Sequence, residues 1–226
     1  MLITCWSVKG GSGVSVVAAA MAGLMARRHG SAVLVDLGGD QGALHGLPEP
    51  SGPGVCDWTA SEAPAEKLAL LTLGSGSEVM VLPPGDAPPV GTLVRAKELA
   101  AAAATLAEVV VVDAGRPLGA HPEQSEHPGS EAHLAVHLRS LGTSLFVTRA
   151  CYLSLRRARA TGVDADGVVL LDEPGRALGA RDVSEVLGLP VVGVVDADPE
   201  VARAVDAGTL SRRIPRTLSR GLRRAG

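Results

Sequence analysis

The sequence predicts one α/β domain, built as a doubly wound and mostly parallel sheet of about seven strands with helices on both faces. Three observations lead to this prediction. Short β-branched runs recur along the chain and are apolar on both faces, as in parallel strands buried between two helix layers. Segments of helical period, rich in Ala, Leu and Arg, separate these runs and are long enough for right-handed crossovers. A glycine-rich turn joins the first run to the first helix.

Length and composition agree with such a domain. A chain of 226 residues can bury one core, and with only 2% aromatic residues that core must be aliphatic. A net charge of -3 argues against a surface built throughout to hold nucleic acid. The three cysteines form no CxxC, and neither a secretory signal nor a membrane-spanning run is present. We expect a cytoplasmic protein, with peripheral binding at the inner face of the membrane as the alternative.

The expected elements follow in order. Strands are expected at residues 2–8, 32–36, 79–83, 109–113, 144–148, 167–171 and 191–195. Helices are expected between them at residues 15–29, 92–106, 131–141, 152–161, 180–187 and 199–207. Two stretches, 45–64 and 115–129, are rich in proline and predict long surface loops, where an open α/β sheet carries its ligand chemistry. We assign residues 1–210 to the domain and 211–226 to a basic amphipathic tail.

The strongest functional signal is the segment VKGGSGVSVVAAAMAGL, which begins at Val8. Its glycines allow the backbone N–H groups to turn inward, and the positive end of the following helix completes a cradle for an anion. Ser15 is placed to put its hydroxyl on a Mg²⁺ ion that bridges phosphates. The alternative is a tight turn whose glycines serve packing alone. We assign nucleotide contact to Gly10, Gly11, Ser12, Gly13, Val14 and Ser15.

These residues resemble the deviant Walker A motif of the ParA/MinD family of ATPases, KGGxGK followed by Ser or Thr. Lys9, the three glycines and Ser15 match the motif, whereas Val14 stands where the family has lysine. The resemblance implies a P-loop fold, ATP or ADP with Mg²⁺ as ligands, and a homodimer. In the family the lysine expected at position 14 grips the β and γ phosphates. The lysine that matches Lys9 reaches across the dimer to the partner's nucleotide, which makes Lys9 a catalytic candidate.

The missing lysine has an energetic consequence. Losing a hydrogen bond to a charged group costs about 1.5 to 3 kcal/mol of binding free energy. Removing a preorganised transition-state donor raises the barrier by about 3 to 4 kcal/mol. We therefore expect weak ATP binding, and weak or absent hydrolysis.

Acidic residues follow two strands. Asp36 ends the strand that precedes GGDQGALHGL and matches a family aspartate that contacts Mg²⁺ indirectly. The family's water-positioning aspartate is replaced by Gly38, and Asp40 could take that catalytic role if the turn carries an insertion. The alternative for Asp40 is that it braces a glycine turn. Asp113 ends the run VVVVD and reads as a Walker B aspartate that holds Mg²⁺ through water, with the Gly115 N–H free to contact a terminal phosphate.

The second half of the chain follows the MinD-like plan of strand, Pro-Gly-Arg loop, short helix, strand and helix. Family members typically have Asn near Glu173 for adenine and Pro near Asp196, and both positions are acidic here. Glu173 is thus a candidate nucleotide contact in an altered base pocket. The segments LVDLGGDQGALHGL and VTRACYLSLRRA look like the TadZ/CpaE branch, which helps localise the assembly machinery of Tad-type pili.

Histidines offer a competing hypothesis. His133 and His137 are spaced to share one helix face and could hold zinc, with His121 and His127 as further ligands. Leu134 stands where a zinc protease would need glutamate. Solvated histidines in a loop and a helix are therefore the favoured interpretation.

The tail LSRRIPRTLSRGLRRAG carries six arginines and no acid. Ile214, Leu218 and Leu222 form an apolar line at helical spacing, although Gly221 weakens the helix. Three readings stay open: docking against the domain or a protein partner, contact with an anionic membrane surface, and nonspecific DNA binding.

We therefore expect a ParA/MinD-like positioning or assembly protein with a degenerate ATP site. Its partners would be a second copy and a protein of a pilus, secretion or cell-division machinery. One alternative is an active dimeric Mg-ATPase switch of the septum-placement or partitioning type, in which Lys9 and Asp40 replace the missing groups. The other is a DNA-binding protein that acts through its arginine-rich end, with nucleic acid the less favoured partner.

Overall fold

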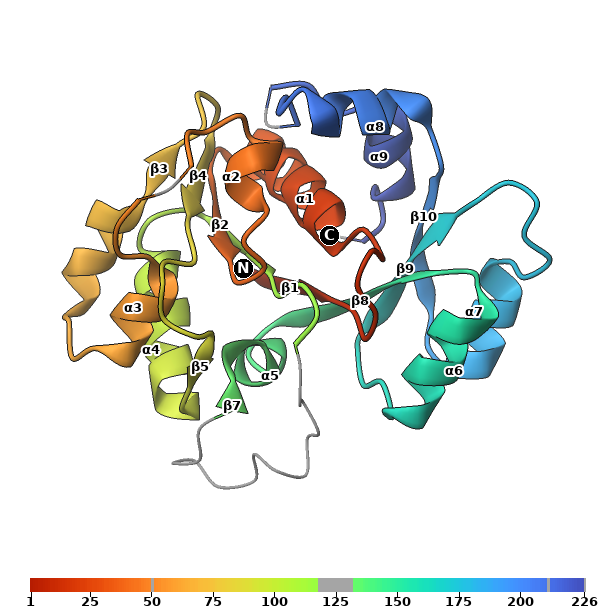
Figure 1. Cartoon of the computed structure of the whole chain (residues 1–226), viewed down its shortest axis with the longest axis horizontal. Coiled ribbons are helices and arrows are strands. Elements are labelled where there is room, and N and C mark those ends of the chain that lie inside the picture. Colours follow the sequence, from red (N-terminus) through yellow and green to blue (C-terminus); the bar gives the residue numbers. More distant parts are fainter. Residues whose placement is uncertain (50, 118–131, 211, 226) are drawn as a thin grey trace.

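The computed structural model describes residues 1–49, 51–117, 132–210 and 212–225 (Figure 1). The main sheet has seven parallel strands that coincide with the expected runs, so the predicted fold class is confirmed. They are β1 (Leu2–Trp6), β2 (Ala32–Asp36), β4 (Val79–Leu82), β6 (Val109–Asp113), β8 (Thr143–Arg149), β9 (Gly167–Asp172) and β10 (Val191–Asp196). A short eighth strand, β3 (Leu73–Gly74), pairs antiparallel with β4. The strand order is β10-β9-β8-β1-β6-β2-β4-β3.

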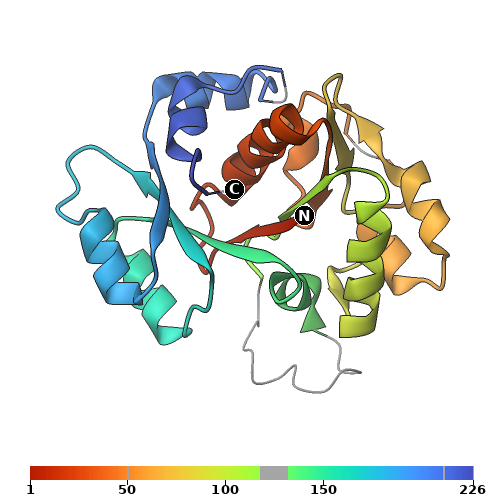
Figure 2. The same cartoon turned by 180° about the vertical axis from the view of Figure 1, so that it is seen from behind.

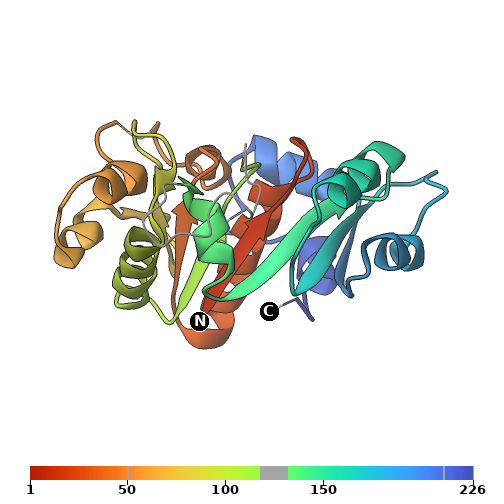
Figure 3. The ribbon, with the colours of Figure 1, turned by 90° about the horizontal axis from the view of Figure 1, so that it is seen from below.

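Two helix layers cover the sheet, one above it and one below it in Figure 1. The upper layer consists of α1 (Val14–His29), α2 (Gln41–Leu44), α8 (Pro199–Asp206) and α9 (Arg216–Gly221). The lower layer, which faces the viewer in Figure 3, consists of α3 (Val55–Ala60), the 3-10 helix η1 (Ala65–Leu71), α4 (Leu93–Ala104), α5 (Leu134–Arg139), α6 (Tyr152–Ala160) and α7 (Ala180–Leu187). The six expected crossover helices are confirmed. A separate two-stranded ladder joins β5 (Val90–Gly91) to β7 (Ala132–His133).

Strand β6 shows why the strand runs are apolar on both faces. Val109 and Val111 point into the apolar cluster beneath α1, whereas Val110 and Val112 point into the cluster under α4 and α5. All four side chains are buried. Because parallel strands between two helix layers have no solvated face, alternation of polar and apolar residues is lost.

The first expected loop, residues 45–64, contains helix α3, which the sequence reading missed. The helix is held in place by Asp57, whose carboxylate accepts the backbone N–H groups of Gly54, Asp86 and Ala87. The prolines on both sides of this short helix concealed its pattern. Of the second expected loop, residues 118–129 lie outside the described residues.

The C-terminal segment packs on the domain. Ile214, Leu218 and Leu222 are 8%, 0% and 0% exposed and join the cluster around α1, with α9 lying between α1 and β10 (Figure 2). Gly23 of α1 makes room for this segment, because a Cβ there would lie 2.7 Å from Ile214 Cδ1. Of the three interpretations, the structure shows docking against the domain, which buries the apolar line. Its exposed arginines are Arg212, Arg213, Arg216, Arg220, Arg223 and Arg224.

Among the helices that the structure describes, none combines the length and the apolar character needed to cross a bilayer.

Docking of the tail leads to a stability prediction. Replacing Leu218 by Ala removes a fully buried side chain and should lower the free energy of unfolding by about 2 to 5 kcal/mol. Arg216→Ala changes an exposed residue of the same helix and should change it by less than about 0.5 kcal/mol. Urea unfolding of both variants measures the difference. Equal stability of the two variants would show that the segment does not pack on the core in solution.

Candidate functional site

The glycine loop between β1 and α1 requires its glycines for conformational reasons. Gly11 and Gly13 have φ angles of 72° and 82°, in the left-handed region that glycine adopts without strain. A Cβ on Gly13 would lie 2.3 Å from the Leu171 side chain. The loop is braced from within by Ser12, whose hydroxyl donates to the Lys9 carbonyl at 2.7 Å.

Unpaired backbone donors gather in this loop. The N–H groups of Gly10, Gly11 and Gly13 make no hydrogen bond within the described part of the chain. The N–H groups of the first turn of α1 also lack partners inside the helix, and the helix dipole adds partial positive charge there. The loop therefore offers what an anion needs, which is several free donors and a positive potential.

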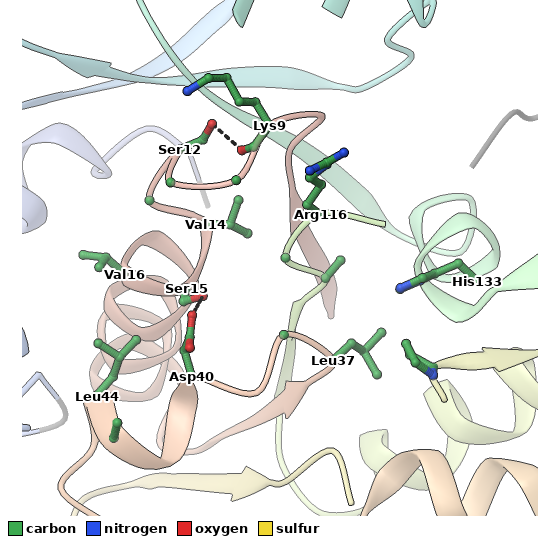
Figure 4. A pocket seen from close by; sticks show the side chains of 18 of the residues that line it. Lys9, Ser12, Val14, Ser15, Val16, Leu37, Asp40, Leu44, Arg116 and His133 are labelled. Carbon is green, nitrogen blue, oxygen red and sulfur yellow. Dashed lines mark hydrogen bonds between the residues drawn. The ribbon is translucent and has the colours of Figure 1, made fainter. Parts of the chain in front are cut away.

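These donors border a cavity of about 780 Å³, which we call the P-loop cavity (Figure 4). A cavity of this size is in the range of small-molecule and cofactor sites. Its lining brings together the predicted nucleotide residues 10–15 with Lys9, Asp40 and Arg116. Val14 is 7% exposed, and Figure 4 shows its isopropyl group turned toward the hollow. An apolar group thus occupies the position from which a cation would reach the phosphates.

Asp36 and Asp113 do not belong to the described lining of the P-loop cavity. They lie side by side at the carboxyl ends of β2 and β6, where they form a register pair. Both carboxylates are buried, and each is held by neighbouring loops. Asp36 accepts the N–H groups of Gly38, Gly39 and Gln41 at 2.6 to 2.9 Å.

The two carboxylates have perturbed acidities. Burial, and after it the negative charge of Asp113, raise the pKa of Asp36 to about 6 against the opposing effect of the three N–H groups. Burial also raises the pKa of Asp113, although hydrogen bonds from Gln41, Ser15 and Gly115 oppose that shift. A cation nearby would relieve both penalties, because it stabilises the ionised forms.

Gln41 is a site residue that the sequence reading missed. Its side chain is fully buried, and its Nε2 donates to Asp113 Oδ2 at 2.7 Å and to the Ser15 carbonyl at 3.0 Å. The side-chain oxygen has no partner among the described residues. Gln41 thus ties the loop after β2 to β6 and to α1. A glutamine two residues beyond a glycine pair was the only sequence signal.

The loop after β2 carries Asp40 into the cavity. Ser15 Oγ donates to Asp40 Oδ2 at 3.3 Å, so these two predicted residues are adjacent and exposed to the cavity (Figure 4). Gly38 lies against the metal-side carboxylate, because a Cβ there would be 3.3 Å from Asp113 Oδ2. A carboxylate at position 38 would therefore crowd Asp113.

The other predicted residues differ in their surroundings. The Gly115 N–H, which was expected to face a phosphate, donates instead to Asp113 Oδ1 at 3.0 Å. Glu173 does not belong to the described lining of the P-loop cavity, and it pairs with Arg149 at 2.9 Å and with Arg176. Its contact with adenine stays a prediction.

The histidine hypothesis gains no support. His133 lines the P-loop cavity and accepts the Ala135 N–H at 3.3 Å, as a helix cap. His137 is buried on α5, so the expectation that it is solvated is wrong for this residue. No group of three or more metal-binding side chains occurs among the residues that the structure describes, while His121 and His127 fall outside them.

No family model matches the chain, and no curated protein matches it in sequence. Solved structures do match. A ParA family ATPase from Chlorobium tepidum TLS superposes with a TM-score of 0.71 at 17% identity, covering 98% of this chain and 96% of that one. The MinC:MinD cell division complex of Aquifex aeolicus gives 0.70 at 17%, covering 97% and 94%. The septum site-determining protein MinD with Mg-ADP from Pyrococcus horikoshii OT3 gives 0.70 at 15%, covering 97% and 91%.

At this level of identity the likeness shows the fold alone, and the chain has the fold of the ParA and MinD ATPases over nearly its whole length.

The buried carboxylate gives a pH prediction for the metal-free protein. The pKa of Asp36 is about 6 in the folded state and 3.8 ordinarily, so the folded state binds the extra proton. The resulting stabilisation is complete below pH 3.8 and is lost as pH rises through 6. Relative to Asp36→Asn, which stays neutral, the native protein should lose about 2 kcal/mol of unfolding free energy between pH 4 and 7.

Chemical unfolding at a series of pH values measures this difference. Asp40→Asn removes an exposed carboxylate from the same loop and serves as the matched control, with the native pH profile expected. Parallel profiles for the native protein and Asp36→Asn would contradict an elevated pKa at Asp36.

Proposed function

We propose that this chain is a positioning or assembly protein of the ParA/MinD type, whose P-loop cavity holds a nucleotide weakly and hydrolyses it slowly or not at all. The observation that carries this proposal is Val14, an apolar side chain inside an otherwise complete glycine loop. The free amides of the loop favour a bound polyphosphate, and the absent lysine weakens it. The nucleotide fold then serves as a platform for dimerisation and docking.

The oxygen donors around the cavity fit Mg²⁺. Ser15 and Asp40 present a hydroxyl and a carboxylate to the cavity, Asp36 and Asp113 are buried, and Gln41 joins Asp113 to the Ser15 carbonyl. Mg²⁺ keeps several waters and is bound through one or two carboxylates together with phosphates, so a cage of protein ligands is not required. Ser15 would contact the ion directly, and the aspartates would hold its waters. The bound ion would supply charge neutralisation for the phosphates. The MinD of Pyrococcus horikoshii was solved with Mg-ADP, which agrees with these ligands.

A second candidate is an active ATPase that works as a dimer. Two observations favour it. The Lys9 side chain extends away from Val14, as a residue that serves a partner's nucleotide would (Figure 4). Asp40 is hydrogen-bonded to Ser15 inside the cavity, where it could orient a water. In this reading Lys9 of the second copy replaces the missing lysine.

The partners follow from the same comparison and from the tail. The MinD of Aquifex aeolicus was solved as a MinC:MinD complex, which supports a protein partner here. We also propose a likeness to the TadZ/CpaE branch, which helps localise the assembly machinery of Tad-type pili. The exposed arginines of α9 are available for an anionic membrane surface or for DNA, through charge alone because the apolar line is buried.

Restoring the lysine tests the main proposal. Val14→Lys puts an ammonium where the valine side chain faces the cavity and should tighten Mg-ATP binding by about 1.5 to 3 kcal/mol, measured by calorimetry. Ala43→Lys adds the same charge to an exposed position on the cavity rim and is the matched control. If both variants bind as the native protein does, the missing cation is not what limits affinity.

Single-turnover hydrolysis separates the two candidates. The proposed weak site predicts negligible Mg²⁺-dependent turnover that Lys9→Ala leaves unchanged. The dimeric ATPase predicts measurable turnover that Lys9→Ala abolishes and that Lys97→Ala, an exposed lysine on α4, preserves. The second pattern would refute a degenerate site and establish the switch.

A further inference from the structure

A polyphosphate in the P-loop cavity needs positive charge that position 14 does not provide. Lys9 is directed elsewhere, because Figure 4 shows its side chain leaving the loop on the side away from Val14. Its charge acts on that other side. The pKa of Glu173 is lowered by the hydrogen bond from Arg176, then by the charge of Arg149 and also by the charge of Lys9.

The arginines beside Lys9 are committed as well. Arg149 and Arg176 both pair with the Glu173 carboxylate. A phosphate would have to compete with that carboxylate for either guanidinium. This cluster also lies outside the described lining of the P-loop cavity.

Arg116 differs from these residues in the direction of its side chain and in its lack of a partner among the described residues. It lines the P-loop cavity, and Figure 4 shows it across the hollow from Val14 and the glycine loop. Its side chain is exposed and makes no hydrogen bond or ion pair with the described residues. A guanidinium whose N–H groups are free can donate two parallel hydrogen bonds to the oxygens of a phosphate bound in the cavity.

The backbone that carries Arg116 is firmly anchored. The Ser7 N–H donates to the Gly115 carbonyl at 3.0 Å, and the Ala114 N–H donates to the Cys5 carbonyl at 2.9 Å. The Gly115 N–H is held by Asp113 Oδ1 at 3.0 Å. These bonds fix the start of the loop after β6 against β1, so Arg116 enters the cavity from a rigid support.

We infer that Arg116 supplies the phosphate-binding cation that the glycine loop lacks, contacting the polyphosphate of a nucleoside di- or triphosphate from the opposite wall. This inference rests on the proposed nucleotide site and adds a residue to it. The phosphates would then lie between the amides of residues 10–15 on one side and the Arg116 fork on the other. In this arrangement the cation comes from the turn after β6, which neighbours β1, and not from the glycine loop itself.

Calorimetry with Mg-ATP and, separately, with Mg²⁺ and inorganic tripolyphosphate tests the inference. Arg116→Ala should lower the affinity for both ligands by about tenfold or more, because one charge-assisted contact to phosphate is lost in each case. Arg116→Lys keeps the charge without the fork and should fall between the native protein and the alanine variant. Arg157→Ala removes an exposed arginine on α6, outside the described lining of the cavity, and should bind as the native protein does.

The outcomes are distinct. Unchanged affinity of Arg116→Ala for both ligands, with the native protein binding them, would overturn the role of Arg116 and leave the nucleotide site standing. Weaker ATP binding with unchanged tripolyphosphate binding would also overturn it, because the contact would not be to phosphate. If the native protein binds neither ligand, the inference and the proposed nucleotide site fail together.

Discussion

Two buried carboxylates at the ends of neighbouring strands organise the site. Asp36 and Asp113 are in register on β2 and β6, and a pair of acids removed from water is stable only if hydrogen bonds compensate for the lost hydration. Here the compensation comes from the turns that follow the strands and from Gln41. The hydrogen bonds to the two carboxylates therefore fix the turn that carries Asp40 and the turn that carries Arg116. These two turns form walls of the cavity opposite the glycine loop.

The glycine loop itself separates what the fold needs from what the chemistry needs. The fold depends on left-handed φ angles at Gly11 and Gly13 and on close approach to Leu171. Val14 satisfies the same fold, since its buried side chain joins the cluster under α1. A lysine at that position would serve ligand binding alone. Exchange of lysine for valine can thus leave the architecture intact while the electrostatics of the cradle change.

Much of the fold could be predicted from the sequence because it depends on local, repeated patterns. The seven strands and six crossover helices follow from apolar runs and helical period, and the glycine loop from its own motif. Helix α3 could not be predicted, because the prolines that flank it are typical of a loop. The hydrogen bonds of Asp57 with Asp86 and Ala87, which hold the helix in place, join residues distant in sequence. Of the site, Lys9, residues 10–15 and Asp40 were identified and do lie on one cavity. Gln41 and Arg116 were not, because their importance arises from neighbours contributed by other strands.

The buried end of the chain has a consequence for proteolysis. Ile214, Leu218 and Leu222 fill the space between α1 and β10, and Gly23 leaves the hollow that Ile214 occupies. A protease that cleaved the chain before Ile214 would expose an apolar groove beside the edge strand β10. Such a shortened molecule would tend to aggregate, because the uncovered apolar surface lies next to the unpaired backbone groups of the edge strand.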